Sequence, residues 1–124
     1  MNRFKFRAYD NKTGLMTYYN FQLDNKPHKE IIIPCSDNVM QCTAVKDKNG
    51  ELIFEGDIVK IKDYNPLGWM RERIGVVQYK YGDYYPAFYV VTTFGDAKDF
   101  NNDMEVIGNK YQHPELLEVQ NEDA

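Results

Sequence analysis

The strongest constraint on the fold is a period-two alternation of apolar and polar residues near the start of the chain. In residues 3–9 the apolar side chains occupy even positions and the charged ones, with one tyrosine, occupy odd positions: Phe4, Phe6 and Ala8 alternate with Arg3, Lys5, Arg7 and Tyr9. A β-strand directs successive side chains to opposite faces, so this pattern predicts a half-buried strand. A second strand is expected at 15–21, after the turn residues at 10–14. No stretch of twelve residues has the apolar spacing of an amphipathic helix.

The middle of the chain predicts a β-hairpin around Asn49-Gly50. This dipeptide favours a two-residue type I′ turn, because both central residues of such a turn need a positive φ. Centred there, the turn joins a strand at 39–45 to one at 52–54 and pairs Val45 with Phe54. Gly56 then interrupts the apolar pattern, which indicates a bulge or a sharp corner before the next strand.

A second hairpin is predicted around Gly82-Asp83, which fits a type II′ turn. This turn joins a strand at 74–81 to one at 84–91 and sets Val77 opposite Phe88. Both faces of the hairpin are partly apolar, as expected inside a closed or double-layered sheet. Residues 63–73 are expected to form a longer loop, and a single helical turn is expected to begin at Pro114.

These elements predict an all-β (β-rich) fold with little helix, in which an N-terminal β-hairpin packs on a small SH3-like or related β-barrel. A length of 124 residues fits one domain. We expect the N-terminal hairpin and a loop at 1–38, the barrel-like core at 39–111, and a flexible acidic tail at 118–124.

The net charge is concentrated near the C-terminal end of the sequence. There are 15 basic and 19 acidic residues, for a net charge of −4. Residues 115–124 hold four of the acids and no base, so the remainder is neutral and has no global field to attract nucleic acid. No apolar run is long enough for a membrane span or a signal-peptide core, and Cys35 and Cys42 lack a metal-binding spacing. We therefore expect a cytoplasmic protein with reduced thiols and no membrane partner.

Residues that usually carry catalysis or metal binding are sparse. His28 lies in a polar loop and His113 precedes a proline, so both are expected to be ordinary surface residues. The acidic loop at 99–105 has oxygen ligands at alternate positions but lacks the glycine and the closing glutamate of a calcium loop. No catalytic, cofactor-binding or metal-binding residue is predicted, and no cofactor. Glu55 and Asp57 flank the glycine at 56, and the sequence leaves open whether this carboxylate pair is functional or holds a corner through backbone hydrogen bonds.

Two segments are candidate binding surfaces. The first is the polar face of the first strand, whose cations and tyrosine would contact phosphates and stack a base, or would instead pair with acids on a neighbouring strand. The second is the 63–73 loop, although its tryptophan would equally plug one end of a barrel. Ten tyrosines, several of them crowded in the second hairpin, favour a protein interface unless half of them belong to the core. The candidate residues are Arg3, Lys5, Arg7, Tyr9, Trp69, Arg71 and Arg73.

Several motifs occur in a recognisable order along the chain: Lys5-Phe6-Arg7-Ala8-Tyr9-Asp10, Val39-Met40-Gln41, Lys46-Asp47-Lys48-Asn49-Gly50, Ile53-Phe54-Glu55-Gly56-Asp57-Ile58-Val59, Val106-Ile107-Gly108-Asn109, Tyr111 and Pro114-Glu115-Leu116-Leu117. Together they resemble the YopX family of small phage and prophage proteins. Ala44-Val45 departs from that pattern, since the family usually has Gly-Leu there. The resemblance implies a β-rich fold and a phage or prophage gene acting in the bacterial cytoplasm. It brings no established activity, so no catalytic residue is carried over.

We therefore expect a phage or prophage accessory protein that is not an enzyme and that works by binding a host or phage protein or by forming a homo-oligomer. The alternative is a nucleic-acid-binding module that uses the basic N-terminal strand face and the 69–73 loop.

Overall fold

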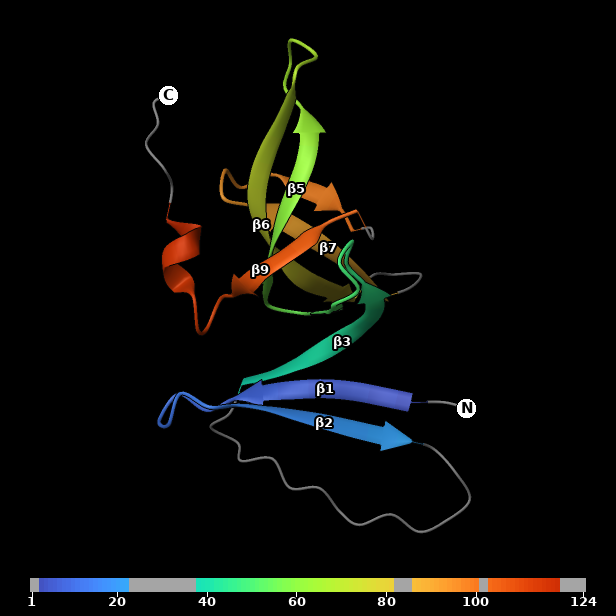
Figure 1. Cartoon of the computed structure of the whole chain (residues 1–124), viewed down its shortest axis with the longest axis vertical. Coiled ribbons are helices and arrows are strands. Elements are labelled where there is room, and N and C mark those ends of the chain that lie inside the picture. Colours follow the sequence, from blue (N-terminus) through green and yellow to red (C-terminus); the bar gives the residue numbers. More distant parts are fainter. Residues whose placement is uncertain (1–2, 23–37, 82–85, 101–102, 119–124) are drawn as a thin grey trace.

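The computed structural model describes residues 3–22, 38–81, 86–100 and 103–118, whose strands form two antiparallel sheets (Figure 1). The first sheet has the order β2-β1-β3-β4 and consists of β1 (Arg3–Tyr9), β2 (Met16–Gln22), β3 (Asn38–Lys46) and β4 (Leu52–Phe54). The second has the order β8-β7-β6-β5-β9 and consists of β5 (Asp57–Tyr64), β6 (Met70–Tyr81), β7 (Pro86–Thr92), β8 (Ala97–Asp99) and β9 (Glu105–Asn109).

The all-β prediction is confirmed. The only helical element in the described ranges is a 3₁₀ turn, η1 (Pro114–Leu117), which begins at the expected proline. Both sheets are open, so the closed SH3-like barrel of the prediction is not seen. β3 was expected in the barrel-like core, but it pairs with β1, with Phe6 opposite Gln41 and Ala8 opposite Val39. The N-terminal hairpin and the start of the expected core therefore share one sheet.

The turn between β3 and β4 differs from the predicted type I′ turn. Lys46 pairs with Leu52, so the connection is longer than two residues, and the predicted pairing of Val45 with Phe54 is wrong. Gly50 has a φ of 87°, whereas Asn49 does not have the positive φ that a type I′ turn requires. The physical reason is the carboxylate of Asp47, which accepts hydrogen bonds from the backbone N–H groups of Asn49 and Glu51 at 2.9 and 2.8 Å.

β3 contains a backbone irregularity at Ala44, the position at which the sequence departs from the family pattern. Its φ is 66°, and among the described non-glycine residues no other has a positive φ. The register of β3 against β4 shifts between Cys42 and Lys46, as in a β-bulge. An alanine in this left-handed region is strained because its Cβ crowds the following carbonyl oxygen.

The second predicted hairpin is present with a different register. Val77 pairs with Val90, two residues from its expected partner Phe88, so the connection is longer than a two-residue turn. An even shift leaves every side chain on its expected face, because side chains alternate with period two. The expected turn at Gly82-Asp83 lies outside the described residues, as do His28 and Cys35.

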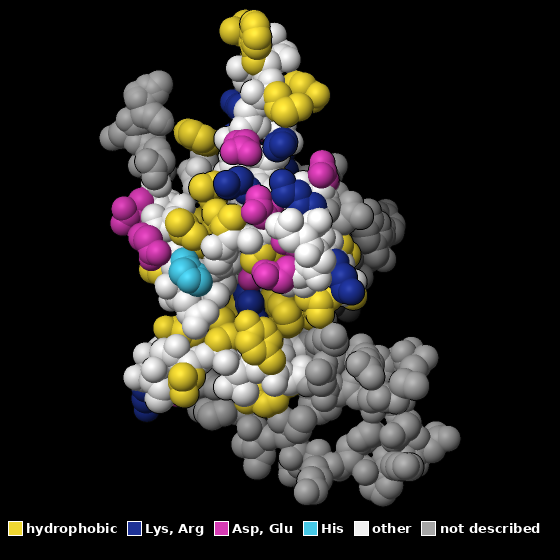
Figure 2. Space-filling model, viewed as in Figure 1, with side chains coloured by type: hydrophobic (Ala, Val, Ile, Leu, Met, Phe, Trp, Pro, Cys, Tyr) yellow, Lys and Arg dark blue, Asp and Glu magenta, His cyan; other side chains and the backbone are white. Residues whose placement is uncertain are grey.

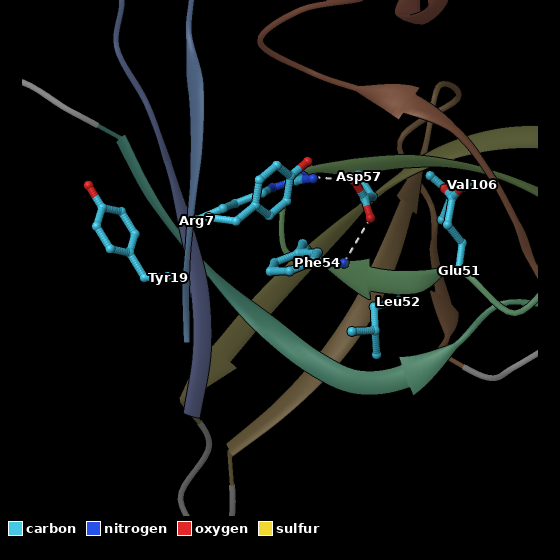
Figure 3. A pocket seen from close by; sticks show the side chains of 8 residues that line it. Arg7, Tyr19, Glu51, Leu52, Phe54, Asp57 and Val106 are labelled. Atoms are coloured by element: carbon cyan, nitrogen blue, oxygen red, sulfur yellow. Dashed lines mark hydrogen bonds and ion pairs between the residues drawn. The ribbon is translucent and has the colours of Figure 1, made fainter. Parts of the chain in front are cut away.

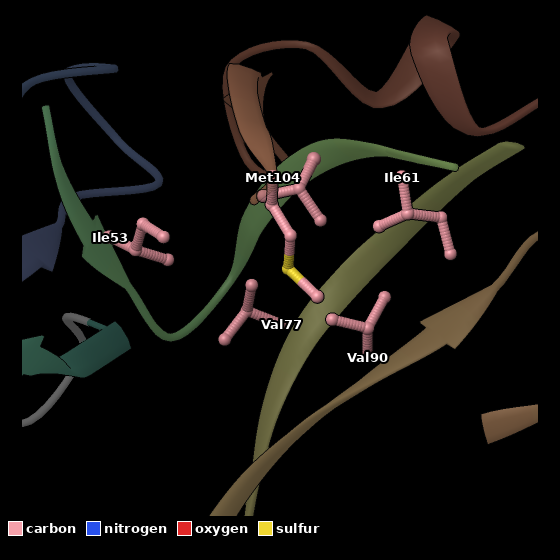
Figure 4. Close-up of a cluster of buried hydrophobic side chains, with 6 residues drawn as sticks. Ile53, Ile61, Val77, Val90 and Met104 are labelled. Carbon is pink, nitrogen blue, oxygen red and sulfur yellow. The ribbon is translucent and has the colours of Figure 1, made fainter. Parts of the chain in front are cut away.

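The hydrophobic core gathers side chains from β4, from three strands of the second sheet and from the segment just before β9 (Figure 4). Its buried members are Ile53, Val59, Ile61, Val77, Val90 and Met104. Gly75 lies beside this core on β6, where a Cβ would approach Val90 Cγ1 to 2.5 Å. The close packing of β6 on β7 therefore requires glycine at this position.

The expected loop at 63–73 is wrong, because most of it belongs to strands. β5 continues to Tyr64 and β6 begins at Met70, so the loop covers only 65–69. Cross-strand pairs of opposite charge extend the ladder, with Lys62 opposite Glu72 and Asp63 opposite Arg71. We call residues 62–73 the finger, because this end of the β5–β6 hairpin projects beyond the rest of the molecule (Figure 1).

Candidate functional site

An ion pair joins the two sheets at the point where they meet. Arg7 projects from β1, and Asp57 is the first residue of β5 (Figure 3). Arg7 Nη2 lies 2.7 Å from Asp57 Oδ1, and the two side chains are only 4% and 3% exposed. The guanidinium also lies over the ring of Phe54, 4.7 Å from its centroid. A hydrogen-bonded pair at this depth holds the first sheet against the corner that opens the second.

The corner before β5 explains the two acids that flank Gly56. Asp57 Oδ2 accepts a hydrogen bond of 2.7 Å from the backbone N–H of Phe54, and Glu55 Oε1 accepts one of 3.3 Å from the N–H of Gln41. Gly56 has a φ of 86°, and a Cβ there would approach Met40 Sδ to 2.7 Å. The predicted corner is therefore confirmed. Burial raises the pKa of Asp57 above its ordinary value, against the opposing effect of the Arg7 charge.

A cleft of about 470 Å³ opens beside this ion pair, between the two sheets. Tyr18 and Phe54 form an aromatic wall, with their rings edge to face at 5.6 Å between centroids. Arg7 Nε is buried and finds no acceptor among the described residues. The cleft therefore offers aromatic surface beside a buried arginine, one donor of which has no partner within the described residues. Its lining consists of Arg7, Tyr18, Tyr19, Glu51, Leu52, Phe54, Asp57 and Val106.

The finger carries a second unusual surface, which Figure 2 shows as hydrophobic side chains at the top of the view. Leu67 is 82% exposed and Trp69 is 70% exposed. Asn65 Oδ1 holds the loop by accepting hydrogen bonds of 3.0 Å from the backbone N–H groups of both residues. We call the exposed set the apolar tip; it consists of Tyr64, Leu67, Trp69 and Met70.

Ion pairs fix the base of the finger. Asp63 lies 2.8 Å from Arg71, 3.0 Å from Arg73 and 3.2 Å from Lys98. Arg73 also contacts Asp96 at 2.5 Å. The hydrogen bond from Arg71 lowers the pKa of Asp63, and the one from Arg73 lowers the pKa of Asp96. Both arginines of the finger therefore have acidic partners within the chain.

The structure does not gather the predicted binding residues into one surface. Arg7 is buried in the ion pair, and Tyr9 stacks on Tyr111 with 5.2 Å between ring centroids. Trp69 is exposed on the finger and does not plug a barrel end. The remaining candidates lie in strands rather than loops: Arg3 and Lys5 in β1, whose side chains are outside the description, and Arg71 and Arg73 in β6.

Sequence reasoning missed the neighbours of Trp69 that complete the apolar tip. Leu67 follows Asn65 and Pro66, two residues that favour turns. A large apolar side chain within a turn sequence indicates that this side chain is exposed to solvent. It also missed Tyr18 and Phe54, because the cleft that they line is formed only when the sheets pack together.

Two of the crowded tyrosines in the β6–β7 hairpin have side chains within the description. Tyr79 and Tyr89 are half-buried. The ring of Tyr79 lies edge to face with Phe88 at 5.0 Å, and the hydroxyl of Tyr89 lies 3.3 Å from Gln78 Oε1.

The described ranges lack the side-chain clusters of a metal site. There, no three His, Cys, Asp or Glu side chains come together in a way that would hold a metal ion. His113 Nδ1 accepts a hydrogen bond of 3.1 Å from the backbone N–H of Asn109. No helix in the part of the chain that the structure describes has the length and apolar character needed to cross a membrane.

Comparisons with known proteins place these features in context. A family model described as YopX protein matches residues 5–118. The chain is similar to a solved structure, the crystal structure of protein EF1440 from Enterococcus faecalis, with a TM-score of 0.53 and 25% sequence identity. That match covers 95% of this chain and 99% of the other. No curated protein matches the chain.

Proposed function

Because the chain belongs to the YopX protein family, for which the sequence resemblance brings no established activity, we propose that it works by binding another protein through the apolar tip of its finger. The observation that carries the proposal is the exposure of four large hydrophobic side chains at one end of a single hairpin. Contiguous exposed apolar patches on a folded domain mark interaction sites.

The composition of the apolar tip suits a protein interface. Trp and Tyr are enriched among the residues that dominate binding energy, and Met adapts its shape to a partner. Burying one such side chain fully contributes about 1.5–3 kcal/mol. The ion pairs at the base and the Asn65 hydrogen bonds hold the finger in place before it binds, so little conformational entropy is lost on binding.

Nucleic-acid binding is the weaker alternative. Of the basic residues predicted to contact phosphates, Arg7, Arg71 and Arg73 are each paired with an acid at 3.0 Å or less, and the side chains of Arg3 and Lys5 lie outside the description. An arginine that already pairs with a carboxylate is less available to neutralise a phosphate. We further propose, following the resemblance, that the protein is a non-enzymatic accessory of a phage or prophage in the bacterial cytoplasm, with a host or phage protein as its partner.

Site-specific photocrosslinking tests the proposal. A photoreactive phenylalanine analogue replaces Leu67 on the apolar tip in one variant and Leu15 in a matched control. Leu15 is 64% exposed but lies in the β1–β2 turn, away from the finger. Irradiation in the bacterial host is expected to give a discrete protein adduct from position 67 and none from position 15. A nucleic-acid adduct at position 67, or no adduct there, overturns the proposal.

A further inference from the structure

The same chain carries a surface that complements the apolar tip. We propose that the tip of one copy docks into the cleft between the sheets of a second copy, so that molecules associate head to tail. This inference rests on the proposed function, because it names the partner of the tip as another copy of this chain.

The tip does not reach the cleft of its own chain. The finger projects from the end of the second sheet that lies away from the first sheet, whereas the cleft opens where the two sheets meet (Figure 1). The strands β5 and β6 are rigidly paired along the whole finger, from Lys62 opposite Glu72 to Tyr64 opposite Met70. The chain therefore cannot fold the finger back, and any tip in the cleft comes from a second copy.

The two surfaces match in size and chemistry. A volume of about 470 Å³ lies within the roughly 300–1,000 Å³ of pockets that enclose a small organic group, so the cleft has room for an indole side chain. The edge-to-face wall of Tyr18 and Phe54 offers aromatic contacts to Trp69. The indole N–H is a donor, and the carboxylate of Glu51 in the cleft lining is an acceptor.

The charges of the two surfaces are opposite. The finger has three bases, Lys62, Arg71 and Arg73, and two acids, which leaves one positive charge. The cleft lining has the base Arg7 and the acids Glu51 and Asp57, which leaves one negative charge. Opposite net charges favour the encounter of tip and cleft over tip with tip or cleft with cleft.

Head-to-tail contact makes a prediction that a symmetric dimer does not make. Tip and cleft are different patches, so each molecule retains one free patch after docking and the association continues into a ring or a filament. Two variants that each lack a different patch should therefore be monomeric alone, and together they should form one-to-one pairs that stop there.

The test uses Trp69→Glu, which puts a charge on the tip, and Tyr18→Lys, which puts a positive charge in the cleft. Both side chains are mostly exposed, at 70% and 61%, so both variants should fold, with at most a small drop in melting temperature for Tyr18→Lys from the lost contact with Phe54. Light scattering with size-exclusion chromatography should show assemblies for the parent and for Leu15→Glu, monomers for each single variant, and heterodimers for their mixture. Each single variant should weaken association at least tenfold.

Fluorescence gives an independent readout, because Trp69 is the only tryptophan of the chain. In the mixture the emission comes only from the Tyr18→Lys copy, and it should shift to shorter wavelength as its tip enters the cleft of the Trp69→Glu copy. A monomeric parent at high concentration, a mixture that stays monomeric, or assembly that persists in both single variants overturns the inference. If the parent is monomeric while the crosslinker at position 67 captures a different protein, this inference fails and the proposed function stands. If the crosslinker captures no protein, both fail.

Discussion

Replacing Arg7 with methionine tests whether the ion pair holds the two sheets together. The change keeps an unbranched side chain of similar length but leaves the carboxylate of Asp57 buried, at 3% exposure, without its cation. Removing one partner of a buried ion pair costs about 3–5 kcal/mol, because the remaining charge is uncompensated. The contact of the guanidinium with the ring of Phe54 is lost as well. We expect Arg7→Met to lower the free energy of unfolding by about 4 kcal/mol at pH 7.

The cost should depend on pH with a definite sign. Burial already raises the pKa of Asp57 in the folded protein, and removing the Arg7 charge raises it further. A carboxyl group whose pKa is raised on folding contributes most below its unfolded pKa of about 4, and the contribution is lost as the pH rises. The penalty of Arg7→Met should therefore shrink as the pH falls from 7 toward about 4.5, because Asp57 becomes protonated.

Urea denaturation at several pH values measures this effect in a double-mutant cycle with Asp57→Asn. The asparagine removes the buried charge and retains an oxygen that can accept the Phe54 N–H, which is 2.7 Å from the carboxylate in the parent. The double variant should be more stable than Arg7→Met alone. A cost below about 1 kcal/mol for Arg7→Met, a cost that does not change with pH, or additive effects in the cycle would refute the argument.

Four further substitutions test local features of the structure. Ala44→Gly should raise the free energy of unfolding by about 0.5–1 kcal/mol, and with it the melting temperature, because glycine adopts a φ of 66° without strain. A lower melting temperature would contradict the strain at this position. Gly75→Ala should lower the free energy of unfolding by about 2–3 kcal/mol, because the new Cβ would approach Val90 Cγ1 to 2.5 Å. Gly50→Ala has nothing within 4 Å of its Cβ and should lose only about 1 kcal/mol, from its positive φ. Equal losses in urea denaturation would refute the close packing at Gly75. Hydrogen bonds from backbone N–H groups lower the pKa of Asp47 despite its burial, so the ionised carboxylate stabilises the fold above about pH 4 and this stabilisation is lost on acidification. Asp47→Asn should therefore be less stable than the parent by about 1–2 kcal/mol at pH 7 and should lose less stability between about pH 5 and 3. An unchanged dependence of stability on acid pH would count against this role.

Much of the fold is local and was predictable. The alternation at 3–9 identifies β1, and the interruption at Gly56 identifies the corner, because strand pleat and positive φ depend only on adjacent residues. The hairpin registers were not predictable in the same way. A dipeptide such as Asn49-Gly50 favours one turn, but the carboxylate of Asp47 stabilises a longer one through contacts that include Val106 N–H in a distant strand, at 2.9 Å.

The candidate site depended still more on long-range contacts. The pattern of β1 places Arg7 on the polar face of its strand, and this placement is correct. Only the packing of the second sheet buries Arg7 and brings Asp57, fifty residues along the chain, to 2.7 Å from it. The same packing creates the cleft, and the length of the paired β5–β6 ladder carries Trp69 away from the body into solvent. Residue order thus determines which side chains share a strand face, whereas whether a face is covered depends on distant strands, because burial is a property of surfaces that meet in space.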